Sequence, residues 1–228
     1  MDTDGSNGSV TIDGSVATYT PTSNYNGDDS FVFEVSDGEL TDTATVTLSI
    51  AAVNDAPVLA TVSDVSFDED QSGLLTLVSS DVDGDDLSYS ISGGSDIIAS
   101  ITGSDISFSA PENYNGSESF TVSVSDGELI DSQSFTVIVN AVNDAPVATT
   151  DLIGITGEDQ SIVISLSASD VDGDNLTFSL DTDGANGSVA IDGNLATYIP
   201  NQDFNGDDSF VFEVSDGELT DTATVTLS

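Results

Sequence analysis

Apolar and polar residues alternate in short runs along this chain, and Gly, Asp and Asn separate the runs. In one run, the alternation puts three side chains on one face of a strand: Phe31, Phe33 and Val35. A second run, residues 41–48, does the same for Ala44, Val46 and Leu48. The Asp37-Gly38 pair between the two runs is typical of a hairpin turn. The pattern predicts two antiparallel strands with these apolar side chains facing inward.

Similar runs predict further strands at residues 74–78, 87–92, 97–102 and 106–110. No window has the sustained 3.6-residue period of an amphipathic helix. Six or seven short strands in about 90 residues favour a Greek-key β-sandwich. The predicted fold class is therefore all-β.

Internal repeats divide the 228 residues into modules. The string Ala-Val-Asn-Asp-Ala-Pro-Val recurs 89 residues later, at 52–58 and 141–147. Residues 2–49 match residues 181–228 at 39 of 48 positions. We therefore predict tandem sandwiches arranged end to end as a rod. Module one (1–53) is the C-terminal part of a module. Module two (54–142) is complete, and module three (143–228) is nearly complete.

Composition excludes several classes of function. The chain has 42 acidic residues and no Lys, Arg, His or Cys, so its formal net charge is −42. Binding to nucleic acid and to anionic membrane surfaces is excluded, because both depend on basic side chains. No apolar run approaches the ~20 residues of a membrane span, so we expect no direct membrane insertion. Nucleophilic triads, disulfides and structural zinc sites also require missing residue types.

Two acidic loops are the strongest candidate ligands for a metal ion. The string Asp-Val-Asp-Gly-Asp occurs at 81–85 and again at 170–174. Calcium (Ca²⁺) takes six to eight oxygen ligands, and alternating Asp residues in a tight loop can supply several of them. The candidate ligands are Asp81, Asp83, Asp85, Asp170, Asp172 and Asp174. The alternative is that these residues form solvated acidic turns, because Asp and Gly are ordinary turn residues.

Several motifs together resemble the bacterial cadherin-like repeat, also called the tandem-95 or bacterial Ig-like repeat. They are Asn24-Tyr25-Asn26-Gly27, Ser36-Asp37-Gly38 and Asn54-Asp55-Ala56-Pro57. Three copies in register make the resemblance specific, and it covers essentially the whole chain. It implies cadherin-type sandwiches with calcium at the junctions between modules.

The resemblance also implies further calcium ligands. Linker residues would contribute at the start of modules two and three, namely Asn54, Asp55, Asn143 and Asp144. An Asp near the last hairpin would join the same sites, at Asp126 and Asp216, and an early Glu would serve the other end of each module, at Glu69 and Glu158. The cadherin Leu-Asp-Arg-Glu motif has no counterpart, which leaves the number of ions at each junction open.

These features predict a structural spacer in a bacterial extracellular adhesin or surface fibre, made rigid by calcium at the junctions. Its partners would be neighbouring modules of the same polypeptide and identical chains in a fibre, at the bacterial cell surface. The alternative is a calcium-dependent module for homophilic or glycan binding. We do not expect an enzyme, because the acids recur in every module instead of gathering in one cleft.

Overall fold

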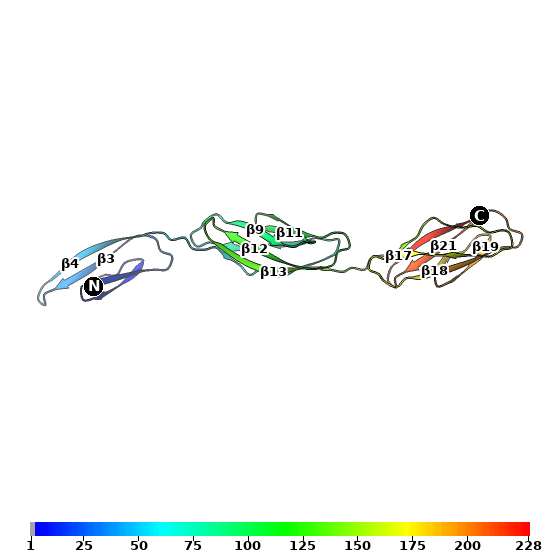
Figure 1. Ribbon diagram of the computed structural model, residues 1–228. Coiled ribbons are helices and arrows are strands. Elements are labelled where there is room, and N and C mark those ends of the chain that lie inside the picture. Colours follow the sequence, from blue (N-terminus) through cyan, green and yellow to red (C-terminus); the bar gives the residue numbers. More distant parts are fainter. Residues whose placement is uncertain (1–2) are drawn as a thin grey trace. The chain divides into compact units, whose positions relative to one another are not determined.

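The computed structural model describes residues 3–228, and the first two residues of predicted module one lie outside this part. The described residues form strands and no helix, which confirms the all-β prediction. No helix that could cross a membrane occurs in them. The chain divides into two compact units, residues 1–140 and 141–228. Figure 1 shows module one in blue, module two from cyan to green and module three from yellow to red.

Module two is a sandwich of two sheets. One sheet has the order β6-β13-β12-β9, in which β6 runs parallel to β13, and the other has the order β10-β11-β7. Short strands β5 and β8 pair with each other at one end. The bounds are β5 (Val58–Leu59), β6 (Val65–Asp68), β7 (Gly73–Thr76), β8 (Ser79–Ser80), β9 (Ser88–Gly93), β10 (Ile98–Thr102), β11 (Asp105–Ser109), β12 (Gly116–Ser125) and β13 (Ile130–Asn140).

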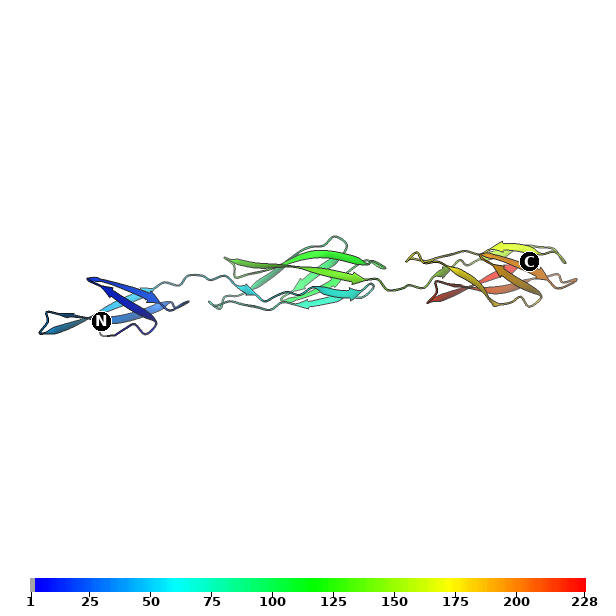
Figure 2. The same ribbon diagram turned by 90° about the horizontal axis from the view of Figure 1, so that it is seen from below.

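The core of module two lies between its two sheets, whose layers are visible in Figure 2. Alternation along β12 buries Phe120, Val122 and Val124, while the residues between them stay partly exposed. The ring of Phe108 on β11 meets that of Phe120 edge to face at 5.4 Å. The four strands predicted in this module are present, with ends shifted by one or two residues.

Module three repeats this topology. Its sheets have the orders β15-β22-β21-β18 and β16-β20-β19, and β14 pairs with β17. As in module two, the last strand of the module pairs in parallel with its second strand: β22 pairs with β15, as β13 pairs with β6. The bounds are β14 (Val147–Ala148), β15 (Leu152–Gly154), β16 (Ile162–Ser165), β17 (Ala168–Ser169), β18 (Thr177–Thr182), β19 (Gly187–Asp192), β20 (Leu195–Pro200), β21 (Asp208–Ser215) and β22 (Thr220–Leu227).

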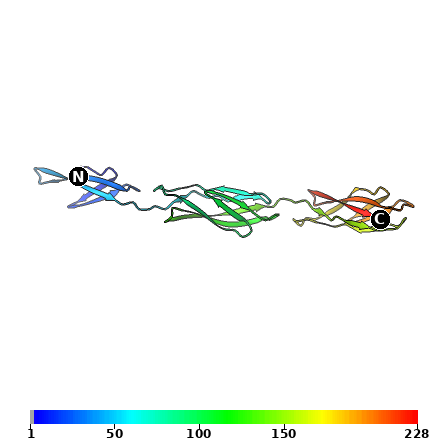
Figure 3. The ribbon, with the colours of Figure 1, turned by 90° about the horizontal axis from the view of Figure 1, so that it is seen from above.

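Module one contains two hairpins, β1–β2 and β3–β4, seen at the blue end of the chain in Figure 3. The bounds are β1 (Gly8–Asp13), β2 (Val16–Pro21), β3 (Gly27–Ser36) and β4 (Thr41–Ile50). The predicted strands and the turn at Asp37 are present, and Phe31 is buried. The prediction that Val35 and Ala44 face inward is wrong here, because no described strand covers them, and Val35 is 60% exposed.

Candidate calcium sites

The acidic loop of module two follows the short strand β8. One carboxylate oxygen of Asp81 accepts hydrogen bonds from the backbone N–H groups of Asp83 at 2.8 Å and Gly84 at 3.1 Å. Gly84 has φ +81°, a conformation that favours glycine, so the loop curls back on itself. As a result, carboxylate oxygens of Asp81, Asp83 and Asp85 lie within 4.8 Å of one another.

Module three contains the same arrangement. Asp170 accepts hydrogen bonds from the backbone N–H groups of Asp172 at 2.9 Å and Gly173 at 3.0 Å. Carboxylate oxygens of Asp170, Asp172 and Asp174 again lie within 4.8 Å of one another. The repeated sequence therefore builds the same three-carboxylate group in both modules.

The linker before module two is bonded to its acidic loop. The side-chain amide of Asn54 donates to Asp126 Oδ2 at 2.9 Å, and the backbone N–H of Asp55 donates to Asp83 Oδ2 at 2.8 Å. The structure thus brings Asn54, Asp55 and Asp126 to the pole of module two that carries Asp81, Asp83 and Asp85.

The linker before module three makes the same two bonds. Asn143 donates to Asp216 Oδ2 at 2.9 Å, and the backbone N–H of Asp144 donates to Asp172 Oδ2 at 2.8 Å. In each module, all the predicted ligands except the early Glu therefore lie together, in the acidic loop, in the linker bonded to it or in the hairpin turn beside it, which makes six residues in each module. We call this end of modules two and three the acidic pole.

Asp126 forms the hairpin turn and also faces the linker. Its Oδ1 accepts the backbone N–H groups of Leu129 at 2.6 Å and Glu128 at 2.7 Å, whereas Oδ2 accepts the amide of Asn54. The hydrogen bonds from Leu129 and Glu128, and then that from Asn54, lower the pKa of Asp126. Asp126 is therefore an anion at neutral pH, and its role in the turn leaves Oδ2 directed at the pole.

Asp216 in module three makes the equivalent bonds, and its pKa is lowered for the same reasons. Asp37 in module one accepts the N–H groups of Leu40 and Glu39 in the same way. No acidic loop accompanies Asp37 among the described residues of module one, so it stands there as a turn residue.

The electrostatics of the acidic pole favour a cation. Partial burial, followed by repulsion from Asp81 and Asp83 and then from Asp126 and Asp86, raises the pKa of Asp85. Within residues 3–228, Asp81 Oδ2 and Asp170 Oδ2 are buried and accept no hydrogen bond. A buried carboxylate oxygen without a partner costs free energy, and a bound cation would remove that cost.

The residues of the acidic pole fit calcium. Each pole offers carboxylate and amide oxygens and no nitrogen or sulfur ligand, which is the donor set of a hard cation. Several of these oxygens are already bonded to backbone N–H groups, so the loop is shaped before any ion arrives. Calcium, which tolerates six to eight ligands in varied geometry, suits such a site better than the strictly octahedral magnesium ion.

Glu69 and Glu158 lie at the other pole of their modules. The backbone N–H of Glu69 bonds to the carbonyl of Asn140 at 2.9 Å, at the end of β13 opposite the Asp126 turn. Glu158 follows Thr156, which bonds to the carbonyl of Ser228 at the far end of module three. Neither Glu joins the acidic pole of its own module. The role of Glu69 and Glu158 as calcium ligands at the other end of each module stays a prediction.

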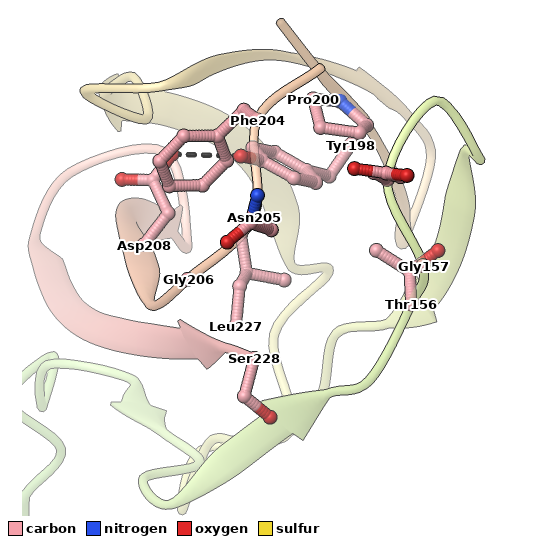
Figure 4. A pocket seen from close by; sticks show the side chains of 11 residues that line it. Thr156, Gly157, Tyr198, Pro200, Phe204, Asn205, Gly206, Asp208, Leu227 and Ser228 are labelled. Carbon is pink, nitrogen blue, oxygen red and sulfur yellow. Dashed lines mark hydrogen bonds between the residues drawn. The ribbon is translucent and has the colours of Figure 1, made fainter. Parts of the chain in front are cut away.

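A small cavity of about 200 Å³ opens at this far end of module three. In Figure 4, the rings of Tyr198 and Phe204 line one side of it, and Thr156 and Gly157 lie on the other. The Tyr198 hydroxyl donates to Asp208 Oδ2 at 2.8 Å. Glu158 also lines this cavity, but it is not part of the three-carboxylate group of module three, which is formed by Asp170, Asp172 and Asp174.

Sequence reasoning missed one carboxylate in each module that anchors a neighbouring loop. In module three, Asp208 accepts the backbone N–H groups of Ala185 and Asn186 as well as the Tyr198 hydroxyl. Burial would raise the pKa of Asp208, but these hydrogen bonds outweigh it and lower that pKa. Its counterparts are Asp29 and Glu118, each with a pKa lowered to about 2. The sequence signal for these residues was an acid at the equivalent position of each module. Such recurrence does not distinguish a carboxylate that anchors a loop from one that binds a metal ion.

Comparisons with known proteins identify the repeats. The sequence model described as a bacterial Ig domain matches residues 2–49, 54–140 and 143–228. A comparison with curated proteins returned no match. Repeats of this family are typically non-catalytic. The three matched domains follow one another in the same chain, so each is adjacent in sequence to another domain of the family.

Solved structures share the fold at low sequence identity. Mouse protocadherin-24 EC1-3 is 14% identical with a TM-score of 0.53, covering 96% of this chain and 86% of its own. Human protocadherin-24 EC1-2 is 19% identical with a TM-score of 0.50, covering 77% of this chain and 100% of its own. An endo-fucoidan hydrolase of glycoside hydrolase family 107 aligns at a TM-score of 0.35 and 19% identity over 98% of this chain, which spans only 37% of the hydrolase. The three matched segments cover nearly the whole chain and show that it belongs to the bacterial Ig domain family.

Proposed function

We propose that this chain is a spacer segment of a bacterial extracellular surface protein, and that modules two and three bind calcium at their acidic poles. One observation carries the calcium assignment. In both modules, the first Asp of the acidic loop has a buried oxygen that accepts no hydrogen bond within the described part of the chain, beside two more carboxylates. The same costly arrangement occurs in both modules, and a bound cation would relieve it in each.

The bonds from the linker explain how calcium would act on the spacer. Asn54 and Asp55 are bonded to the residues of the acidic pole, so an ion bound there would also hold the linker. Without the ion, repulsion among Asp81, Asp83 and Asp85 opposes this closed arrangement. We infer that calcium converts a flexible linker into a fixed one.

An extracellular location suits this chemistry. Calcium sites of modest affinity fill in extracellular fluid, where the ion is at millimolar concentration. The formal charge of −42 opposes close packing of neighbouring modules, and bound cations offset part of that charge. Recurrence of the acids in successive modules fits a repeated structural role better than a single catalytic one.

Isothermal titration of the full chain with calcium tests the assignment. We expect saturable binding at each acidic pole. The double variant Asp81→Asn/Asp170→Asn should lose most of the affinity, because it removes the buried charge from both poles. Asp192→Asn is the control, since it removes one carboxylate charge from an exposed hairpin of module three, away from the acidic pole. Equal binding by the two variants would contradict a site at the poles.

A further inference from the structure

Modules two and three differ at one position on the last strand of the sandwich. Gln133 lies on β13 and Ala223 lies on β22, each seven residues after the Asp of its hairpin turn, Asp126 or Asp216. Both face inward, in step with the buried residues of their strands. The two modules therefore compare a long side chain that ends in an amide with a methyl group at the same place.

In module two, the Gln133 side chain joins β13 to the chain that follows β5. Its amide nitrogen donates to the carbonyl oxygens of Leu59 at 2.8 Å and Ala60 at 3.2 Å. Its amide oxygen accepts the backbone N–H of Val62 at 3.0 Å. One carboxamide group thus uses both its donors and its acceptor on three neighbouring backbone groups.

The corresponding segment of module three starts from the same place. The backbone N–H of Ala148 donates to Asp221 Oδ2 at 2.9 Å, as that of Leu59 donates to Asp131 Oδ2 at 2.8 Å. Ala148 and Leu59 lie 89 residues apart, which is the offset of the repeated linker. The two segments are therefore in register where they begin, and the side chains that face them can be compared directly.

A cavity lies beside Ala223 in module three. It has a volume of about 410 Å³ and lies between β22 and the segment that leads into β15, with Asp151 and Ile153 in its wall. Three threonines of β22 also line it: Thr222, Thr224 and Thr226. Asp151 is the one acid among the described residues that line it, so the cavity is nearly free of charge in a strongly acidic chain.

We propose that this cavity binds a primary carboxamide, the group that Gln133 supplies in module two. The equivalents of its three backbone partners are the carbonyls of Ala148 and Thr149 and the N–H of Asp151, and a methyl group at position 223 bonds to none of them. A carboxamide suits all three, because it has two N–H donors and an acceptor oxygen. A carboxylate has no donor for the carbonyls, and an ammonium group has no acceptor for the N–H.

An NMR titration of the full chain tests the proposal, in chelator so that calcium plays no part. Propanamide represents a free small molecule, and a blocked Ser-Gln-Ser peptide, which copies residues 132–134, represents a side chain of another protein. Each should shift the backbone amide signals of Thr150, Asp151 and Ala223 and saturate in the millimolar range, as small ligands do. Tighter binding of the peptide assigns the amide to a protein, and equal binding assigns it to a free small molecule.

The matched acids test the chemistry of the site. Propanoate and a blocked Ser-Glu-Ser peptide should bind about tenfold more weakly or worse, because they leave the backbone carbonyls without a donor. Signals of residues 59–62 in module two should not move with any probe, since the Gln133 amide already occupies that place.

Two variants exchange the residues of the modules. Ala223→Gln should abolish the shifts in module three, because a tethered amide competes at an effective concentration near millimolar. Gln133→Ala should create the same response at residues 59–62, a result that does not depend on the folding of the first variant. Ala190→Gln, at an exposed position of module three, is the matched control and should bind as the unmodified chain does.

Three results would overturn the proposal. They are equal binding of propanamide and propanoate, shifts that persist in a folded Ala223→Gln chain, and the absence of saturable shifts with both amide probes.

Discussion

At the scale of single residues, the acids of this chain do two kinds of work. Asp81 uses one oxygen to fold its own loop and leaves the other buried and without a hydrogen bond in the described part of the chain. Glu118, in contrast, places both oxygens on backbone N–H groups and on the Ser95 hydroxyl. Both residues are acidic, and only their hydrogen bonds distinguish Asp81, the candidate calcium ligand, from Glu118, which anchors a neighbouring loop.

Replacing Asp81 by Asn should lower calcium affinity and leave the calcium-free fold at least as stable. The amide removes one of three clustered charges, so repulsion within the loop decreases. We expect the calcium affinity of module two to fall by about tenfold or more. In chelator, the unfolding midpoint of the variant should be no lower than that of the unmodified chain. Titration calorimetry and thermal unfolding measure the two effects. Retained affinity together with a lower midpoint would make Asp81 a purely structural residue.

Glu118 should make the stability of module two depend on pH. The hydroxyl of Ser95, followed by backbone N–H groups of residues 95–97, lowers the pKa of Glu118 to about 2. A carboxyl whose pKa is depressed on folding stabilises the fold above its unfolded pKa of about 4.3, and this contribution is lost as pH falls toward 2. Glu118→Gln should remove that part of the acid dependence in denaturant unfolding.

The matched control for this change is Glu128→Gln, on an exposed turn of the same module. Protonation of other acids in the same pH range relaxes charge repulsion and acts in the opposite direction, so the comparison between variants isolates Glu118. If both variants show the same acid slope, the hydrogen bonds of Glu118 do not contribute to stability.

At the scale of elements, alternation predicted the strands and the face each would bury, but not whether that face would be covered. Phe31, Phe33 and Val35 alternate as Phe210, Phe212 and Val214 do, since the two sequences are identical. Burial of Val214 depends on strands supplied by residues 143–180, more than 30 residues earlier in the chain. Local periodicity contains no information about that partner.

The hairpins β3–β4 and β21–β22 have the same sequence, so one substitution can be compared at an exposed and at a buried position. Val214→Ala should destabilise module three by about 2 kcal/mol, through lost burial and the cavity it leaves. Val35→Ala should change stability by less than about 0.5 kcal/mol, because that side chain is mostly exposed. Denaturant unfolding followed by hydrogen exchange resolves the modules. Equal costs would mean that the face bearing Val35 is covered in solution.

At the scale of the whole molecule, the repeat predicted a tandem arrangement, and the family model matches three successive segments of the chain. The sequence also pointed to both acidic loops, because Asp-Val-Asp-Gly-Asp recurs at the same place in modules two and three. The resemblance placed Asn54 and Asp126 in the same site, but it did not predict the hydrogen bond between these two residues, 72 positions apart, because that contact depends on how the sandwich closes. The linkers are therefore part of the acidic poles as a consequence of the fold.

Calcium should raise the unfolding midpoints of modules two and three independently. A ligand that binds only the folded state adds about 2.7 kcal/mol at a concentration 100 times its dissociation constant. In scanning calorimetry, Asp170→Asn should remove the calcium-induced shift for module three and keep it for module two. If that one substitution removed both shifts, a single shared site would replace two separate poles.

Small-angle scattering of the full chain, in millimolar calcium and then in excess chelator, tests the central claim most directly. We predict a larger maximum dimension and a stiffer chain in calcium, and a shorter, flexible ensemble in chelator. The Asp81→Asn/Asp170→Asn variant should resemble the chelator state under both conditions. Profiles of the unmodified chain that superimpose with and without calcium would contradict the claim that the ion stiffens this spacer.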